Sequence, residues 1–239
     1  MKLLTAPTSN PKIAKSLKLN VLTAVLHLAP YDLSGYQVCP MATAGCAYAC
    51  LNTAGRGGII KKGETTNAIQ KARIRKTKLF FEDRPVFFEL LIKDIQAVIR
   101  KAAREGFEKV GIRLNGTSDI PFEIYKVEFE GVVYDNIMAL FPEVQFYDYT
   151  KRFNRKNLPE NYHLTFSLAE DNRSFAEKAL DNGMNVAAVF RKELPKKFLK
   201  TKVINGDDHD FRPADGSGVI VGLIAKGKAK TDTSGFVQD

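Results

Sequence analysis

Three cysteines, Cys39, Cys46 and Cys50, lie within twelve residues of a 239-residue chain that has no other cysteine, and their spacing is C-x6-C-x3-C. Thiolate sulfur is a soft ligand that binds zinc and iron–sulfur clusters. Structural zinc usually takes four protein ligands, whereas a 4Fe-4S cluster on three cysteines leaves one iron for an exchangeable ligand. The spacing therefore predicts an iron–sulfur cluster. A zinc site would need a fourth ligand, such as His27, and small apolar core residues are the alternative without a metal.

A second set of polar residues follows the segments that we predict to be strands. In parallel α/β folds the loops after the carboxyl ends of the strands meet on one edge of the sheet, where ligands bind. The cysteine loop should share this edge. We therefore predict a small-molecule or nucleotide ligand there, bound by Asn115, Thr117, Ser118, Tyr147, Asp148, Lys151 and Ser167, with Asp207, His209, Asp210 and Arg212 on the far side.

Some of these residues also have simpler interpretations. Ser118 could cap the turn that follows it. The stretch Asp207, Asp208, His209 and Asp210 has the composition of a site for a hard metal ion or for acid–base chemistry. Metal-dependent phosphoester cleavage by a nuclease is one function that this stretch would allow. Acidic loop residues are also commonly solvated, and both interpretations stay open.

The order of predicted elements indicates an α/β protein. Residues 19–28 predict a first strand, and the Gly-, Ala- and Thr-rich segment 31–63 carries the cysteines. Apolar residues at helical spacing predict helices over residues 65–81 and 85–106. Further strands are predicted at 109–115, 144–149, 162–168, 184–190, 202–205 and 218–225, and further helices at 134–141 and 172–182.

Strands that alternate with helices are typical of a parallel sheet. We predict one α/β domain over residues 1–239, built as a partial (βα) barrel or an open sheet of about six to seven mostly parallel strands. A polar leader precedes the first strand, and the polar composition from about residue 228 onward predicts a flexible tail.

The charge balance is basic. Lys and Arg number 36 against 27 Asp and Glu, for a formal net charge of +9. This charge favours an anionic partner, although widely spread basic residues also serve solubility alone. The helix predicted over residues 65–81 carries a dense basic run of Lys71, Arg73, Arg75, Lys76 and Lys78. Nucleic-acid binding, with zinc or an iron–sulfur cluster as a structural metal, is therefore an alternative function.

No apolar run approaches the roughly 20 residues that a transmembrane helix needs. We therefore expect no membrane partner and a cytoplasmic protein. Thiols stay reduced in the cytoplasm, which leaves an odd number of cysteines free to bind a metal.

The cysteine loop after a first strand, followed by alternating strands and helices with polar strand ends, resembles the radical S-adenosylmethionine enzymes. In that superfamily three cysteines ligate a 4Fe-4S cluster, and the open iron binds the amino and carboxylate groups of S-adenosylmethionine. The resemblance implies a TIM-barrel-like fold, S-adenosylmethionine as a cofactor and, if the protein is catalytic, an electron donor. The usual spacing there is C-x3-C-x2-C, so C-x6-C-x3-C is a variant.

A closer resemblance spans most of the chain. Its motifs are Cys39-Pro, Cys46-Ala-Tyr-Ala-Cys50-Leu, Thr53-Ala-Gly-Arg-Gly57, Asp148-Tyr-Thr-Lys151, His209-Asp-Phe-Arg212 and residues 219–227. These motifs are similar to those of a family of phage and prophage proteins called gene product eighty-eight. The resemblance implies a phage origin, and hence the host cell cytoplasm as the location, but it brings no assigned activity.

Overall fold

The computed structural model describes residues 1–5 and 14–239, so part of the predicted N-terminal leader lies outside the described residues. Seven parallel strands form the centre of the fold, and each coincides with a strand that the sequence predicts. They are β2 (Val21–Leu26), β3 (Lys109–Arg113), β6 (Gln145–Thr150), β7 (Tyr162–Ser167), β8 (Val186–Phe190), β10 (Thr201–Asn205) and β11 (Ile220–Ile224).

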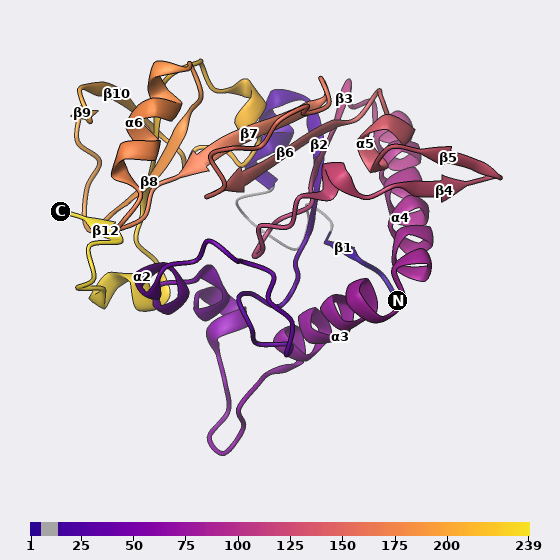
Figure 1. Cartoon of the computed structure of the whole chain (residues 1–239), viewed down its shortest axis with the longest axis horizontal. Helices are drawn as coiled ribbons and strands as arrows, with labels where there is room; N and C mark the ends of the chain where they lie inside the picture. The colour runs from indigo at the N-terminus through magenta and orange to yellow at the C-terminus, as the bar shows by residue number, and fades with distance from the viewer. Residues whose placement is uncertain (6–13) are drawn as a thin grey trace.

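The sheet is open at both edges. Its order is β1-β2-β3-β6-β7-β8-β11-β10-β9, with β1 (Leu4–Thr5) antiparallel to β2 and β9 (Lys197–Phe198) antiparallel to β10. A separate hairpin joins β4 (Val127–Phe129) to β5 (Val132–Tyr134), and it projects from the side of the molecule near α4 (Figure 1). The described chain is thus a mixed α/β protein with a mostly parallel central sheet, and this sheet does not close into a barrel.

Two long helices pack against each other, α3 (Ala68–Glu82) and α4 (Arg84–Glu105), and α4 covers one face of the sheet at β1, β2 and β3. Asp83 caps the start of α4, with Pro85 in its first turn, and the helix ends at Gly106 with φ 75°, a conformation that favours glycine. The rings of Phe80 and Phe87 meet edge to face at 5.1 Å in the core between these helices and the sheet. This packing holds α3 beside the amino end of the chain.

Short helices complete the same layer, namely α5 (Ile137–Leu140) and α6 (Arg173–Asp181). Alternate residues of β7 point toward the helices: Tyr162 and Leu164 belong to the core under α4, and Phe166 belongs to the core under α6. The single-turn helices are η2 (Ser16–Leu19), η3 (Leu51–Thr53), η4 (Gly55–Gly58), η5 (Phe122–Ile124), η6 (Arg212–Ala214) and η7 (Gly227–Thr231).

Residues 206–217, which include η6, cover the opposite face of the sheet. Phe211 lies directly on strand β3 because Gly111 has no side chain there: a Cβ at Gly111 would lie 2.9 Å from Phe211 Cε2 and 3.0 Å from Thr23 Cγ2. The ring of Phe211 also meets Tyr147 edge to face at 5.4 Å. Polar residues on this face of the sheet are therefore buried.

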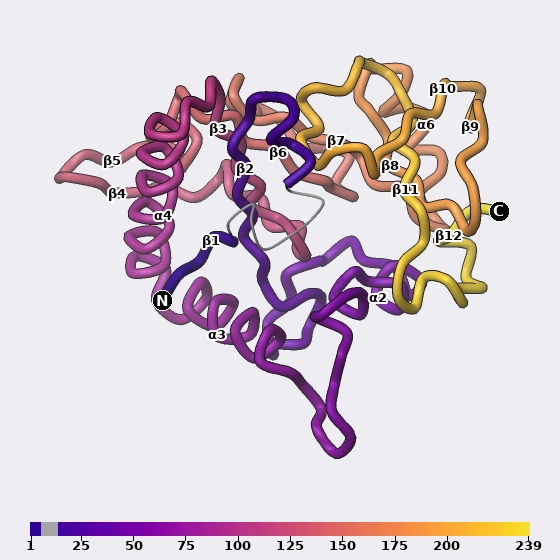
Figure 2. The backbone as a smooth tube through the Cα atoms, turned by 180° about the vertical axis from the view of Figure 1, so that it is seen from behind, coloured from indigo at the N-terminus to yellow at the C-terminus, as the bar shows by residue number. Residues whose placement is uncertain are grey.

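The end of the chain packs onto the fold, which differs from the flexible tail expected from about residue 228. Strand β12 (Val237–Gln238) pairs with Val189 and Phe190 of β8, beyond the point where β7 pairs with that strand. Asp232 is buried and accepts hydrogen bonds from Ser234 Oγ at 2.7 Å and from the amide of Val237 at 3.1 Å. In Figure 2 the yellow C-terminal segment lies beside α2 (Ala44–Tyr48).

Candidate functional site

The three cysteines lie on the loop that leads from β2 to α3, at the carboxyl edge of the sheet. Cys39 Sγ lies 3.8 Å from the carbonyl oxygen of Thr117, in the loop after β3. Cys46 lies in α2, where its amide donates to the side chain of the N-cap residue Thr43 at 3.1 Å. Cys50 follows that helix. All three thiols are free and half-buried.

Burial disfavours the thiolate forms of Cys39 and Cys50. It raises the pKa of Cys39 to about 12, and negative charge on Cys50 or Cys46 raises this pKa further. Burial also raises the pKa of Cys50; charge on Cys46 adds to this effect, while the cations Arg73 and Lys151 oppose it. The three sulfur atoms therefore lie within electrostatic range of one another, and two cations face the same loop.

The cysteines do not converge as metal ligands in this arrangement. Within residues 1–5 and 14–239, no group of three or more His, Cys, Asp or Glu side chains is placed so as to hold a metal ion. The donor set nevertheless fits a soft metal, because three thiols on one short loop supply the ligands that zinc and iron–sulfur clusters prefer. A metal would have to draw the loop inward to bring Cys39, Cys46 and Cys50 together.

Glu170 anchors the helix that carries Cys46. Its carboxylate accepts from Thr43 Oγ1 and from the amide of Gly45, both at 2.7 Å. A Cβ at Gly45 would lie 2.0 Å from Ser234 Oγ, so the C-terminal segment rests directly on this helix. Cys46 itself packs against a small apolar cluster formed by Ala49, Ala169, Ala225, Ala229, Phe236 and Val237.

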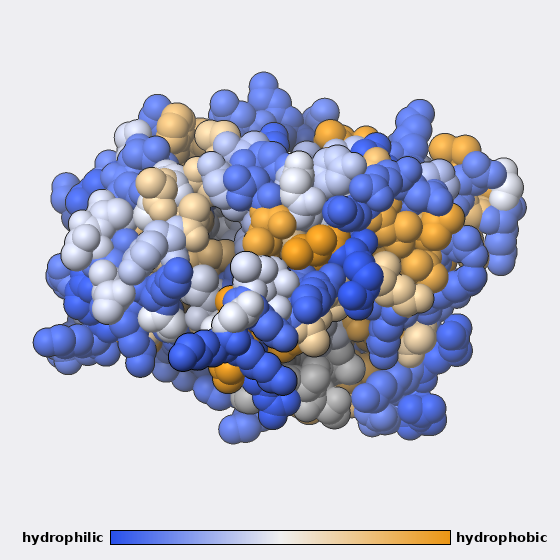
Figure 3. Space-filling view, turned by 90° about the horizontal axis from the view of Figure 1, so that it is seen from below, coloured by the Kyte–Doolittle hydropathy of each residue, from blue (hydrophilic) through white to orange (hydrophobic). Residues whose placement is uncertain are grey.

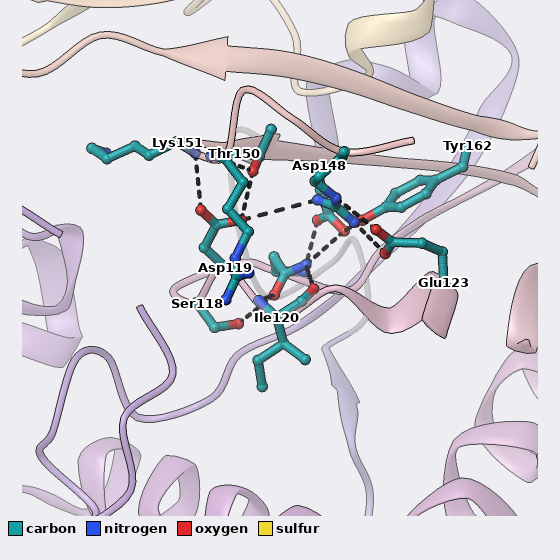
Figure 4. A network of polar contacts seen from close by, with 11 residues as sticks. Ser118, Asp119, Ile120, Glu123, Asp148, Thr150, Lys151 and Tyr162 are labelled. Atoms are coloured by element: carbon teal, nitrogen blue, oxygen red, sulfur yellow. Dashed lines mark hydrogen bonds and ion pairs between the residues drawn. The ribbon is translucent and has the colours of Figure 1, made fainter. Parts of the chain in front are cut away.

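Several of the predicted ligand-binding residues bond to one another. The amide of Asn115 donates to Asp148 Oδ1 at 2.7 Å, Asn115 Nδ2 donates to Asp148 Oδ2 at 3.1 Å, and Tyr162 Oη donates to the same oxygen at 2.8 Å (Figure 4). Ser118 Oγ donates to Asn115 Oδ1 at 2.8 Å. Burial raises the pKa of Asp148 to about 6. These contacts fix the loop that follows β3.

Asp119 extends this network to the next strand. It accepts from Thr150 Oγ1 at 2.8 Å and from the amide of Lys151 at 2.9 Å (Figure 4). Beside it, Arg155 Nε donates to Glu123 Oε1 at 2.8 Å, and a second ion-pair contact joins the same two side chains. Sequence reasoning missed Arg155 and Glu123, because neither residue belongs to a motif.

Tyr147 faces the opposite side of the sheet from Asp148, because successive strand residues point to opposite faces. Tyr147 Oη donates to Asp210 Oδ2 at 3.2 Å, and Arg113 Nη1 lies 3.3 Å from Asp210 Oδ1. The guanidinium of Arg113 lies over the ring of Tyr149 at 4.6 Å. The predicted site is therefore divided between the two faces of the sheet.

Arg212 is fully buried on this second face. Its Nη1 lies 3.3 Å from Asp215 Oδ2, and its Nη2 lies 3.1 Å from His209 Nδ1. The buried polar atoms here that have no hydrogen-bond partner among the described residues include Arg212 Nε, Tyr149 Oη, His163 Nε2 and Thr165 Oγ1. These atoms all lie in the polar layer between the sheet and residues 206–217.

The acidic stretch disperses its side chains. Asp207 Oδ1 accepts from Lys226 Nζ at 2.7 Å, and Asp208 Oδ1 accepts from Asn205 Nδ2 at 2.7 Å, whereas Asp210 points inward to the buried face. The three carboxylates of Asp207, Asp208 and Asp210 therefore have separate partners and do not point to one site.

Three predicted residues stay at the carboxyl edge near the cysteines. Thr117 Oγ1 donates to the carbonyl of Leu28 at 2.6 Å, and Lys151 Nζ donates to Ser167 Oγ at 3.1 Å. His27 directly follows β2 and is half-buried, and desolvation, helped by Arg73, lowers its pKa to about 3. The imidazole of His27 is therefore neutral, and it lies at the start of the loop that carries the cysteines.

The same segments recur in a known family. The family model described as gene product 88 matches residues 2–239, which include the cysteine loop and every strand end described above. The chain belongs to the gene product 88 family. The comparisons find no matching curated protein and no matching solved structure, and so they give no support to a likeness to radical S-adenosylmethionine enzymes. No helix within the described parts of this gene product 88 chain has the length and apolar character needed to cross a bilayer.

Proposed function

We propose that this gene product 88 protein binds an iron–sulfur cluster of the 4Fe-4S type through Cys39, Cys46 and Cys50. The observation that carries the proposal is the placement of all three thiols on one loop, within electrostatic range of one another, at the carboxyl edge of a mostly parallel sheet. That edge is where ligands bind in α/β folds. We also propose that the protein is encoded by a phage and acts in the cytoplasm of the host cell.

The surroundings of Cys50 favour a bound anionic group. Three thiolates around a cluster carry more negative charge than the metal neutralises, and nearby cations stabilise that charge. Arg73 and Lys151 both lower the pKa of Cys50. Arg73 is held in place by Asn52, whose Oδ1 accepts from Arg73 Nη1 at 2.5 Å, and Lys151 is held by Ser167.

A cluster on three cysteines has one iron with a coordination position for an exchangeable ligand. Thr117, Lys151 and Ser167 lie at the same edge and supply hydroxyl and ammonium groups for such a ligand. S-adenosylmethionine is the ligand we propose to test first, because the cysteine loop after a first strand is the feature shared with enzymes that use it.

The deciding experiment is purification without oxygen, followed by measurement of iron, sulfide and zinc and by visible absorption spectroscopy. We expect iron and sulfide in near-equal amounts, and loss of both in each of Cys39→Ser, Cys46→Ser and Cys50→Ser. Ala47→Ser, which adds a hydroxyl to the same helix and leaves the thiols intact, should retain the cluster. A colourless protein with stoichiometric zinc, or a protein with no metal after reconstitution, would overturn the proposal.

Binding of S-adenosylmethionine is measured on the reconstituted protein by calorimetry, and its cleavage by detection of 5'-deoxyadenosine after reduction. A cluster that binds no S-adenosylmethionine would exclude this ligand and leave the cluster itself established.

A further inference from the structure

The basic residues of helix α3 are divided between two faces. Arg73 and Lys76 point inward: Arg73 Nη1 donates to Asn52 Oδ1 at 2.5 Å, and Lys76 Nζ donates to the carbonyl of Leu3 at 2.6 Å. Both therefore have structural partners inside the molecule. The three remaining basic residues are exposed, and we call them the basic face: Lys71, Arg75 and Lys78.

The three cations of the basic face form a line along the helix. Their spacing of four and three residues places them on one side, over a length of about 10 Å. None of them forms an ion pair with any residue in the described ranges. The only acidic residue of α3 is Glu82 in its last turn, where Oε1 accepts from Tyr36 Oη at 3.1 Å. No ion pair within residues 1–5 and 14–239 thus neutralises the positive charge of this line.

A second group of exposed cations continues from the start of α3. Asn67, the N-cap of this helix, donates through Nδ2 to the carbonyls of Arg56, Gly57 and Ile59 at 3.2, 2.9 and 2.9 Å. The loop held in this way projects beyond α3 in Figure 2, and the view from below shows hydrophilic surface interrupted by apolar patches (Figure 3). Its exposed basic residues are Arg56, Lys61 and Lys62.

We propose that the basic face and this loop bind the sugar–phosphate backbone of a nucleic acid. A linear array of cations on a helix matches a linear array of phosphates, whereas a single small anion would need donors that converge on one point. Long, flexible lysine and arginine side chains suit phosphates, and the neighbouring amides of Asn67 and Gln70 are already bonded within the chain, so no Asn or Gln side chain of this described segment is left to read bases. The interaction is therefore expected to depend on salt and to show little preference for sequence.

A competing basic surface lies on the β9–β10 hairpin, at the far edge of the sheet. Its exposed lysines are Lys192, Lys196, Lys197, Lys200 and Lys202. Lysines on an edge strand have a structural explanation, because they prevent pairing with the edge of another sheet. The basic face of α3 covers no strand edge, and this difference singles it out as the binding surface.

The test measures the binding of fluorescent mixed-sequence duplex DNA, single-stranded DNA and single-stranded RNA across a salt titration. The variant Lys71→Gln/Arg75→Gln/Lys78→Gln removes the basic face, and Lys196→Gln/Lys197→Gln/Lys200→Gln removes the same charge from the hairpin. All six residues are exposed, so both variants should retain the circular dichroism spectrum of the native chain.

For duplex DNA, loss of three phosphate contacts should reduce the slope of log affinity against log salt by about 2.7. Between 50 and 200 mM salt the native chain should then lose ~40-fold more affinity than the α3 variant. The hairpin variant should match the native chain. The proposal is overturned if the native chain binds none of the three probes at low salt, or if the hairpin variant shows the larger loss. Because the basic face contains no cysteine, these results are independent of the metal content.

Discussion

The amide of Asn115 donates to the carboxylate of Asp148 at 2.7 Å in a fully buried contact that joins the loop after β3 to strand β6. This contact gives a structural role to two residues that the sequence placed in a ligand site: their polar atoms help to hold the carboxyl edge of the sheet in shape. The loop positioned in this way carries Thr117, whose carbonyl faces Cys39.

Asp148 should make stability depend on pH. Burial, opposed by Arg113 and by its hydrogen bonds, raises its pKa from the usual 3.8 to about 6. The folded chain therefore holds this proton in a range where the unfolded chain has lost it. As pH rises from about 4 to about 6, the free energy of unfolding should fall, by an amount on the order of 3 kcal/mol from this group alone.

Chemical unfolding of the native chain and of Asp148→Asn at a series of pH values isolates this contribution. The native chain should lose stability relative to the variant between pH ~4 and ~6, and the difference should then level off. Parallel pH profiles for the two proteins would show that Asp148 does not titrate in this range.

Glu170 should control access to Cys46. Glu170→Ala removes both hydrogen bonds that hold the first turn of α2, which should favour local opening by about 2 kcal/mol and speed thiol labelling of Cys46 roughly 30-fold. Labelling rates followed by mass spectrometry give the measurement. Glu177→Ala, which removes an exposed ion pair with Arg173 on α6, is the matched control. Equal rates for the two variants would contradict the anchoring role.

Gly45 should be indispensable for the packing of the C-terminal segment. In Gly45→Ala the new methyl group would meet Ser234 Oγ at 2.0 Å and Glu170 Oε1 at 2.7 Å, which should cost about 1–3 kcal/mol of stability. Gly216→Ala is the control, because a Cβ there meets nothing within 4 Å. Thermal unfolding of both variants checks this. Adding Ser234→Gly to Gly45→Ala should restore part of the loss.

The central strands were predictable because each is a short apolar run with a polar end. The short strands were not. Val237 and Gln238 form β12 only because β8 has a free side beyond its pairing with β7, and nothing in a polar terminal segment signals that contact. The order β8-β11-β10 likewise depends on how segments pack in space, which periodicity does not encode.

The sequence predicted which segments meet at the carboxyl edge, but not how their side chains are arranged. The carboxyl edge did gather the cysteine loop, Thr117 and Lys151, as the parallel strands required. Tyr147 and Asp148 were predicted to bind one ligand at this edge, although the two-residue period of a strand places neighbouring side chains on opposite faces. Similarly, helical periodicity separates Lys71 from Arg73 on α3, but only the structure shows which side meets the protein.

Two threonines on opposite faces of the sheet should respond differently to the same substitution. Thr150 Oγ1 donates to Asp119 Oδ1 at 2.8 Å and accepts from the amide of Arg152 at 3.0 Å, whereas Thr165 Oγ1 has no partner among the described residues. Both side chains are almost fully buried. Valine has the shape of threonine without the hydroxyl, so the exchange tests hydrogen bonding at nearly constant packing.

Thr150→Val should therefore cost about 1–3 kcal/mol, because it leaves a buried carboxylate oxygen and an amide without their partner. Thr165→Val should be neutral or stabilising by up to about 1 kcal/mol, because an unpartnered buried hydroxyl is costly. The free energies of unfolding in urea give the comparison. If the free energy of unfolding of Thr165→Val falls by more than about 1 kcal/mol, this hydroxyl is hydrogen-bonded in solution. Its partner would then be a water molecule buried between the sheet and residues 206–217.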